Sequence, residues 1–499
     1  MAGLLLAAVV LVATRLADLT PSQSWTAAVA SLCATWWILE ALPMPATSLV
    51  PLAVFPITGV LTERQAAAAY GDPIVMLFLG AFMVSTAVER WGAHRRIAQA
   101  MMGVIGSTSG PRIMLAIMLA TTLCSFWINN TSITLMMLPV ALAVVEQDKS
   151  GKLAVPLLLG VAYCSSIGGI ATPIGTAPNG VFQSNYEKVT GETVPFHHWM
   201  LLGGLVAMLM MVAAWIVLSW RVRGVPAIKI EASGRWTAPQ KRTMAVFGLA
   251  ALAWITREVP YGGWSEWLSP IIGKSDAGDM TVAVAAALES FLLLPYGSWS
   301  EWLSPRIGGS EAGDMTVAVA AALALFLLPS GEKKGERLLD WETAQSIPWG
   351  VLVLFGGGIA LAAAFESSGL SAVMGEKVTG LSDWPLVATI GVLCLATTFF
   401  SEVTSNTATA NLLMPILAST AVANNMEPAL LMFPATLANS LAFMMPVGTP
   451  PNAIVYASGQ LRIIDMVRYG FVLNLIGVAI VTVVCWWLMP VVFGGYGTP

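Results

Sequence analysis

The sequence SFWINNT at residues 125–131 interrupts a long apolar run, and SEVTSNT at 401–407 interrupts a second one. Each is followed by a motif that breaks helices, PIGTAPN at 173–179 and PVGTPPN at 446–452. Inside a lipid bilayer, backbone of this kind is tolerated only where protein or a water-filled cavity satisfies its polar groups. Interrupted apolar segments at corresponding places in two halves of a chain indicate a binding site near the middle of the membrane.

The two halves correspond beyond these motifs. LFLG at 77–80 pairs with LFGG at 354–357 at an offset of 277 residues, the Asn-Thr motifs pair at 276, and the Gly-Thr-x-Pro-Asn motifs pair at 273. Because the register drifts so little, the pattern indicates an internal duplication. An odd number of membrane crossings between equivalent points makes the repeat inverted, which places the two motif pairs face to face.

The composition predicts a polytopic membrane protein. The chain is 57% hydrophobic and 10% charged, whereas a soluble domain has roughly 25% charged residues. Two apolar regions, 112–145 and 386–423, contain the Asn-Thr motifs, so we expect each to form a re-entrant helical hairpin with the motif at its tip. Apolar segments long enough to span a bilayer, about 20 residues, lie near 4–20, 24–42, 45–62, 73–90, 154–183, 199–220, 243–257, 348–366, 428–458 and 469–493. We therefore predict an all-α inverted-repeat fold with about 11 transmembrane helices plus two hairpins.

The distribution of Lys and Arg predicts the topology. The basic residues cluster at Arg90, Arg95 and Arg96, between Arg221 and Arg242, at Lys333, Lys334 and Arg337, and at Arg462 and Arg468. Cytoplasmic loops carry the excess of such residues. We therefore expect a cytoplasmic N-terminus and an exterior C-terminus in a cell inner membrane. The first hairpin then enters from the cytoplasm and the second from the exterior.

A tandem duplication interrupts the otherwise regular order of segments. Residues 261–295 recur almost unchanged at 296–329. If both copies crossed the membrane, the basic cluster at 333–337 would lie outside, so we expect only one copy to occupy a helix position. We expect the remaining regions to be N-terminal scaffold helices at 1–72, a first repeat core at 73–222, a linker with scaffold helices at 223–345, and a second repeat core at 346–499.

The four motifs offer neutral oxygen and nitrogen ligands but no positive side chain. Asn130, Thr131, Asn406 and Thr407 would place amides and hydroxyls at the hairpin tips, where helix ends favour ions. No Lys or Arg lies in any of the motifs. An anion would therefore be held by neutral donors and helix N-termini, with bound cations compensating its charge. Na⁺ takes hydroxyl, amide and carbonyl oxygens, so the sequence favours a site shared by an anion and cations.

Other roles for polar residues in the apolar segments also need weighing. A single Asn-Thr motif in a membrane helix more often joins helices than binds a ligand, but duplication in register favours a binding site. Glu402 is either a proton carrier or a structural carboxylate, and we favour the structural role. The five cysteines and three histidines lack the spacing of a metal site. An enzyme is disfavoured because no intramembrane cluster offers a nucleophile or a metal.

At these residues the chain resembles the divalent anion/sodium symporter family. SEVTSNTAT at 401–409 resembles the family's second hairpin tip, and PVGTPPN at 446–452 resembles its Pro-x-x-Thr-Pro-Pro-Asn signature. The resemblance covers almost the whole chain outside the tandem duplication. It implies a homodimer in which a transport domain moves against a scaffold domain like an elevator. It also implies symport of Na⁺ with a small di- or tricarboxylate, such as succinate or malate. A Na⁺-independent dicarboxylate exchanger and a sulfate or other inorganic-anion carrier remain alternatives.

The resemblance also assigns ligands. It places substrate carboxylates against side chains at both tips and both loops: Asn130, Thr131, Asn406, Thr407, Thr176, Thr449 and Pro450. It places one Na⁺ around Ser125, Asn129, Asn130 and Gly175, and a second around Ser401, Thr404, Asn406 and Gly448. The first motif departs from the family in having Asn129 where Ser is usual. The second has Ser401 where Thr is common.

Overall fold

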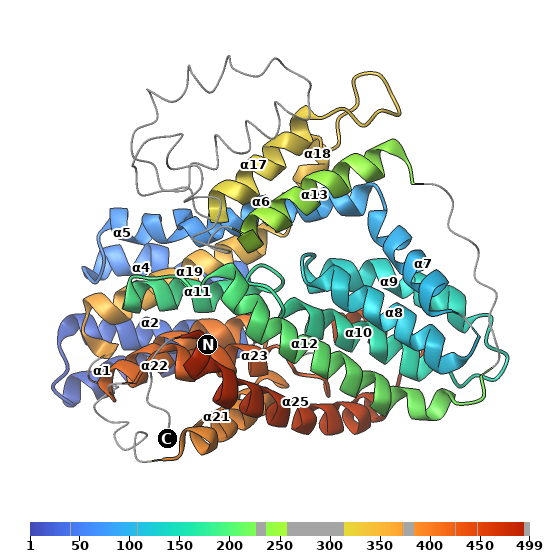
Figure 1. Cartoon of the computed structure of the whole chain (residues 1–499). Coiled ribbons are helices and arrows are strands. Elements are labelled where there is room, and N and C mark those ends of the chain that lie inside the picture. The colour runs from blue at the N-terminus through green and yellow to red at the C-terminus, as the bar shows by residue number, and fades with distance from the viewer. Residues whose placement is uncertain are drawn as a thin grey trace.

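The computed structural model describes residues 1–39, 41–106, 108–225, 236–256, 314–371, 373, 384–424, 426–446 and 448–493. These residues form an all-helical protein, as predicted (Figure 1). The only β-type pairing among them is an isolated bridge between Pro329 and Arg337.

The first half contains helices α1 to α12. Their bounds are α1 Ala2–Leu16, α2 Pro21–Ile38, α3 Met44–Thr47, α4 Val50–Thr58, α5 Glu63–Ala68, α6 Pro73–Arg90, α7 Ala93–Ile105, α8 Gly110–Ser125, α9 Asn130–Val145, α10 Ala154–Gly169, α11 Ala177–Thr190 and α12 Phe196–Ser219. Two short 3₁₀ helices, η1 Ala69–Gly71 and η2 Trp220–Val222, precede α6 and follow α12.

The second half contains a corresponding series. Its described helices are α13 Ala238–Thr256, α17 Asp314–Leu327, α18 Trp341–Ala344, α19 Trp349–Ser367, α21 Leu386–Ser401, α22 Asn406–Ala423, α23 Ala429–Asn439, α24 Pro450–Ala457 and α25 Ile463–Val492. By length and composition, four stretches of described helix could cross a membrane: Glu63–Arg90, Phe196–Ser219, Trp349–Ser367 and Ile463–Val492. Shorter apolar helices include both arms of the first predicted hairpin and the first arm of the second.

Each predicted hairpin region is broken at its Asn-Thr motif. Helix α8 ends at Ser125 and α9 begins at Asn130, while α21 ends at Ser401 and α22 begins at Asn406. The two arms contact each other in both cases. The four residues between the arms form a tip in each half, which we call tip 1 (residues 126–129) and tip 2 (residues 402–405).

The helices of the two halves make equivalent contacts. In the first half α10 packs on α8, α9 and α12, and in the second half α23 packs on α21, α22 and α25. Contacts between the halves are also matched, because α11 packs on α22 and α24 packs on α9. Each helix that begins at a Gly-Thr-x-Pro-Asn motif therefore lies against the hairpin of the other half.

The second copy of the tandem duplication occupies a helix position. Residues 314–327 form α17, which lies along α6 and also contacts α13 (Figure 1). The contact with α6 is close, since a Cβ added to Gly80 would lie 2.5 Å from the backbone carbon of Ala318. The first copy, 261–295, lies outside the described residues, so its place in the fold stays a prediction.

Candidate functional site

Tip 1 is built by the N-terminus of α9. The side chain of Asn129 accepts a hydrogen bond of 2.9 Å from the backbone N–H of Thr131, and therefore caps the helix. Asn is among the best N-cap residues, which explains why an amide is accommodated here. The cap commits the side-chain oxygen of Asn129 to a hydrogen bond within its own helix, although this residue is predicted to bind the first Na⁺.

Three predicted site residues meet beside tip 1. The hydroxyl oxygen of Ser125 lies 3.0 Å from Oδ1 of Asn130 and 2.6 Å from the carbonyl oxygen of Ser165. The amide nitrogen of Asn130 donates to the hydroxyl of Thr176 at 3.4 Å. Residues from α8, α9 and the start of α11 thus form one polar cluster. Ser165 belongs to this cluster too, because its hydroxyl donates to the carbonyl oxygen of Asn130 at 2.6 Å.

Gly175 lies against the same tip. A Cβ at this position would lie 2.5 Å from the carbonyl oxygen of Gly169 and 3.0 Å from that of Phe126. Only glycine allows this approach of the loop to tip 1. The first predicted cation set is therefore assembled in part: Ser125 and Asn130 are in contact, and Gly175 packs against the tip between them.

Tip 2 is held by a residue that the sequence reasoning missed. Asn439, at the end of α23, accepts a hydrogen bond of 2.5 Å from the hydroxyl of Ser401 and donates one of 2.6 Å to the carbonyl oxygen of Asn406. Its amide therefore links the two arms of the second hairpin. The sequence shows only an Asn at the end of a mostly apolar segment before the second Gly-Thr-x-Pro-Asn motif, which indicates a polar contact but not its partner.

The other predicted residues of the second half surround tip 2. The hydroxyls of Thr404 and Thr409 lie 2.6 Å apart. A Cβ on Gly448 would lie 3.2 Å from the carbonyl oxygen of Ser401. Oδ1 of Asn406 is buried and has no hydrogen-bond partner among the described residues. An oxygen of this kind is a candidate ligand for a cation or a substrate group, since burying it unpaired costs free energy.

The remaining predicted substrate residues lie at helix N-termini. Thr131 and Thr407, both half-buried, are the second residues of α9 and α22. Thr176 and Thr449 are the buried N-cap residues of α11 and α24. Pro450 begins α24 and is exposed. Four helix N-termini therefore carry these side chains, and helix N-termini favour anions.

Glu402 in tip 2 is held by several donors. Its carboxylate accepts hydrogen bonds from the backbone N–H groups of residues 443–445 at 2.7–3.0 Å. It also accepts one from the side chain of Asn474 at 2.6 Å. These contacts agree with the structural role favoured from the sequence.

The oxygens available at the two tips are hydroxyl, amide and carbonyl oxygens. Hard cations prefer such ligands. Among the residues that the structure describes, no group of three His, Cys, Asp or Glu side chains could hold a metal ion. The donor set therefore suits an alkali cation better than a transition metal.

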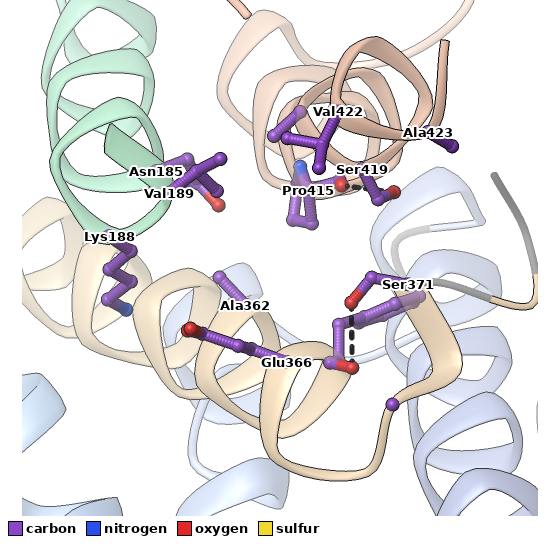
Figure 2. Close-up of a pocket in the computed structure, with 13 residues that line it drawn as sticks. Asn185, Lys188, Val189, Ala362, Glu366, Ser371, Pro415, Ser419, Val422 and Ala423 are labelled. Atoms are coloured by element: carbon purple, nitrogen blue, oxygen red, sulfur yellow. Dashed lines mark hydrogen bonds between the residues drawn. The ribbon is translucent and has the colours of Figure 1, made fainter. Parts of the chain in front are cut away.

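A separate cavity of about 550 Å³ lies between α11, α19 and α22 (Figure 2). Lys188 and Glu366 line this cavity, and the Lys188 amine donates to the carbonyl oxygen of Ile359 at 2.7 Å. None of the predicted site residues lines this cavity. We therefore place the candidate site at the tips, where the polar contacts converge.

Known proteins share both the sequence and the fold. The family model described as the sodium:sulfate symporter transmembrane region matches residues 1–493. A sodium-dependent dicarboxylate transporter of Staphylococcus saprophyticus is 34% identical, over 99% of this chain and 92% of its own length. Its counterpart in Staphylococcus aureus is 33% identical, over 96% of this chain and 88% of its own length. The solved YdaH transporter of Alcanivorax borkumensis shares the fold, with a TM-score of 0.58 at 14% identity over 92% of this chain and 98% of its own.

Proposed function

The chain belongs to the sodium:sulfate symporter family, and from this premise we propose that it carries C4-dicarboxylates such as succinate or malate into the cell with Na⁺. Relatives that cover nearly the whole chain bear the name sodium-dependent dicarboxylate transporter. The family is the one expected from the motifs. Its members are membrane transporters, so the proposal concerns the cargo, the coupling and the residues responsible.

The single observation that carries the proposal is that each hairpin tip meets a loop leading to a helix N-cap with a threonine, Thr176 in the first half and Thr449 in the second. Asn130 contacts Thr176 directly, and Oδ1 of Asn406 is buried with no hydrogen-bond partner among the described residues. A dicarboxylate has two anionic ends, and we assign one end to Asn130 and Thr131 and the other to Asn406 and Thr407. We assign Thr176, Thr449 and Pro450 to the rest of the substrate-binding site.

Two Na⁺ ions balance the two carboxylates. The tips contain no Lys or Arg, so cations must supply the compensating charge. The first ion takes oxygens from Ser125, Asn130 and Gly175, with Asn129 adjacent. The second takes oxygens at tip 2, from Ser401, Thr404, Asn406 and Gly448. Binding of substrate then depends on Na⁺ because each ion neutralises one end of the substrate.

Transport proceeds by alternating access. The matched contacts of the two halves support an inverted repeat, in which the two hairpins enter from opposite sides. The scaffold consists of residues 1–72 and 223–345, against which the repeat cores at 73–222 and 346–499 carry the substrate as an elevator. The proposal includes a homodimer in a cell membrane, with the N-terminus cytoplasmic and the C-terminus exterior.

Uptake by proteoliposomes tests the proposal. The purified protein is reconstituted and labelled succinate uptake is measured with an inward Na⁺ gradient, with K⁺ in place of Na⁺, and with succinate preloaded inside. We expect uptake only under the Na⁺ gradient. Uptake without Na⁺ that requires internal succinate would show an exchanger instead. Uptake of sulfate but not succinate would show an inorganic-anion carrier, and no uptake of any of them would reject the proposal.

The variant Asn406→Ala tests the assigned site. It removes both the unpaired amide oxygen, a cation ligand, and the amide N–H donors to a substrate carboxylate, so it should reduce Na⁺-driven succinate uptake at least about 100-fold. Asn185→Ala is the matched control, since Asn185 is a buried amide whose nitrogen donates within α11 to the carbonyl of Val181. Wild-type uptake by Asn406→Ala would reject the assignment.

A further inference from the structure

The two Gly-Thr-x-Pro-Asn motifs end in asparagines that make the same pair of contacts. The side-chain nitrogen of Asn179 donates to the carbonyl oxygens of Gly169 (2.9 Å) and Thr172 (2.7 Å). That of Asn452 donates to those of Ala442 (3.3 Å) and Met445 (3.0 Å). In both halves the acceptors lie ten and seven residues before the asparagine. Each asparagine therefore folds the preceding loop back onto the start of its helix.

These asparagines are completely buried. Both are 0% exposed, and Oδ1 of each has no hydrogen-bond partner among the described residues. The orientation of each amide is fixed, because the reverse orientation would place Oδ1 against two carbonyl oxygens. Each asparagine therefore leaves its Oδ1 buried and unpaired among the described residues, while its side-chain N–H groups bind two carbonyl oxygens before the helix. Since an unpaired buried oxygen costs free energy, the two donors must serve a purpose that an apolar residue would not.

A second contact joins each loop to its hairpin tip; in both halves the loop donates and the tip accepts, but the donor is a side chain in the first half and the backbone in the second. In the first half the hydroxyl of Thr172, on the loop, donates to the carbonyl oxygen of Phe126 in tip 1. In the second half the carboxylate of Glu402, in tip 2, accepts from the backbone N–H of Met445 on the loop at 2.9 Å. Phe126 corresponds to Glu402, and Thr172 to Met445, under the internal repeat.

We infer that these contacts form a loop clamp in each half, and that each clamp sets the Na⁺ affinity of its own tip. Clamp 1 consists of Asn179 and Thr172, and clamp 2 consists of Asn452 and Glu402. Neither asparagine is assigned to a ligand, so both are positioning residues. The inference rests on the proposed function and adds the residues that hold its cation sites together.

The glycines show how a clamp acts on a cation site. Gly175 follows Thr172 on the clamped loop and packs against the carbonyl oxygens of Phe126 and Gly169. Gly448 follows Met445 and packs against those of Ser401 and Glu402. A cation that bridges loop and tip needs both sets of oxygens at fixed separation. If the loop is released, a smaller fraction of molecules holds the loop and tip oxygens at this separation. The apparent Na⁺ affinity falls in proportion to that fraction.

The test measures the Na⁺ concentration that gives half-maximal succinate uptake. We expect Asn179→Ala and Asn452→Ala each to raise this concentration roughly tenfold, the effect of losing about one net hydrogen bond. The KM for succinate at saturating Na⁺ should change less than about threefold. Because the clamps belong to different tips, the double variant should show the product of the two single effects. Asn185→Ala, the control on α11, should leave both values unchanged.

Other outcomes separate the possible failures. Folded Asn179→Ala and Asn452→Ala proteins with wild-type Na⁺ dependence would overturn the inference. If Asn179→Ala does not fold, Thr172→Val decides for clamp 1, because it removes only the hydroxyl contact with tip 1; a Na⁺ dependence equal to that of the wild type would again overturn it. Wild-type protein that transports succinate without Na⁺ would instead refute the proposed coupling. The same wild-type measurement therefore distinguishes failure of the function from failure of the clamps.

Discussion

At the scale of single residues, Glu402 is the buried carboxylate that most needs an explanation. The segment at 441–446 after α23 is not helical, so its backbone N–H groups lack partners within a helix. Three successive ones, at 443–445, donate to Glu402. Buried backbone donors must be satisfied, and an ionised carboxylate accepts several hydrogen bonds at once. The residue therefore stabilises an irregular segment, and we predict that it does not carry a proton.

Replacing Glu402 with glutamine tests this role. Gln has nearly the same shape, but its –NH₂ group would face N–H donors, leaving at least one of them unsatisfied. Hydrogen bonds to charged groups contribute about 1.5–3 kcal/mol each, so we expect Glu402→Gln to lower the thermal midpoint of the purified protein by several degrees. Glu146→Gln, at an exposed position after α9, is the control. A Glu402→Gln protein with wild-type stability but altered proton movement would favour the proton-carrier role.

The sequence predicted where the apolar helices break better than it predicted the contacts at the breaks. Small polar residues stand out in apolar runs, so the motifs indicated both tips. The partners of these residues come from helices elsewhere in the chain, and no local pattern indicates that Asn439 would link the arms of the second hairpin. Asn129 was predicted as a Na⁺ ligand, but the sequence did not indicate that its side chain caps α9.

At the scale of elements, the pairing of α6 with α17 depends on one glycine. A Cβ at Gly80 would lie within 2.7 Å of the carbon and oxygen of Ala318 and of the nitrogen of Val319. All three are backbone atoms, which cannot rotate away as a side-chain end would. Gly80 recurs in the second half as Gly357, but the sequence does not indicate which helix packs on it.

The substitution Gly80→Ala should therefore separate α6 from α17. Overpacking typically costs about 1–3 kcal/mol, and the backbone contact places this case at the upper end. We expect a lower thermal midpoint and less monodisperse protein on gel filtration. Gly248→Ala is the matched control, because Gly248 lies within α13 with no atom within 4 Å of the added Cβ. Equal stability of the two variants would contradict the packing described for α6.

At the scale of the whole molecule, each half packs one of its helices against the hairpin of the other half. Helix α11 of the first half packs on α22, and α24 of the second half packs on α9. These contacts add to those that each loop makes with the tip of its own half. The correspondence of the two halves was predictable from register alone, and the meeting of all four motifs stays a prediction. The choice of one tandem copy for the position beside α6 was not predictable, because the two copies are nearly identical in composition.

Within the apolar stretch that forms α17, the two copies differ at buried positions. Ala324 and Leu325 of α17 are 5% and 0% exposed. The corresponding residues of the first copy, at an offset of 35, are Glu289 and Ser290. The first copy in this position would bury a carboxylate and a hydroxyl among apolar side chains. An uncompensated buried charge costs several kcal/mol, which gives a physical reason for the second copy to occupy the position.

Two deletions test whether the burial of these two positions decides which copy lies beside α6. Removing 261–295 joins Pro260 to Tyr296 and keeps the sequence of α17, so we expect wild-type yield and wild-type Na⁺-driven succinate uptake. Removing 296–329 joins Pro295 to Ser330 and forces the first copy into the position beside α6, with Glu289 in place of Ala324. We expect this variant to be largely unfolded, and the added substitutions Glu289→Ala and Ser290→Leu to restore folded protein on gel filtration. If both deletions gave equally active protein, burial of these two residues would not decide between the copies; if removing 261–295 abolished folding, the first copy would be an essential part of the fold.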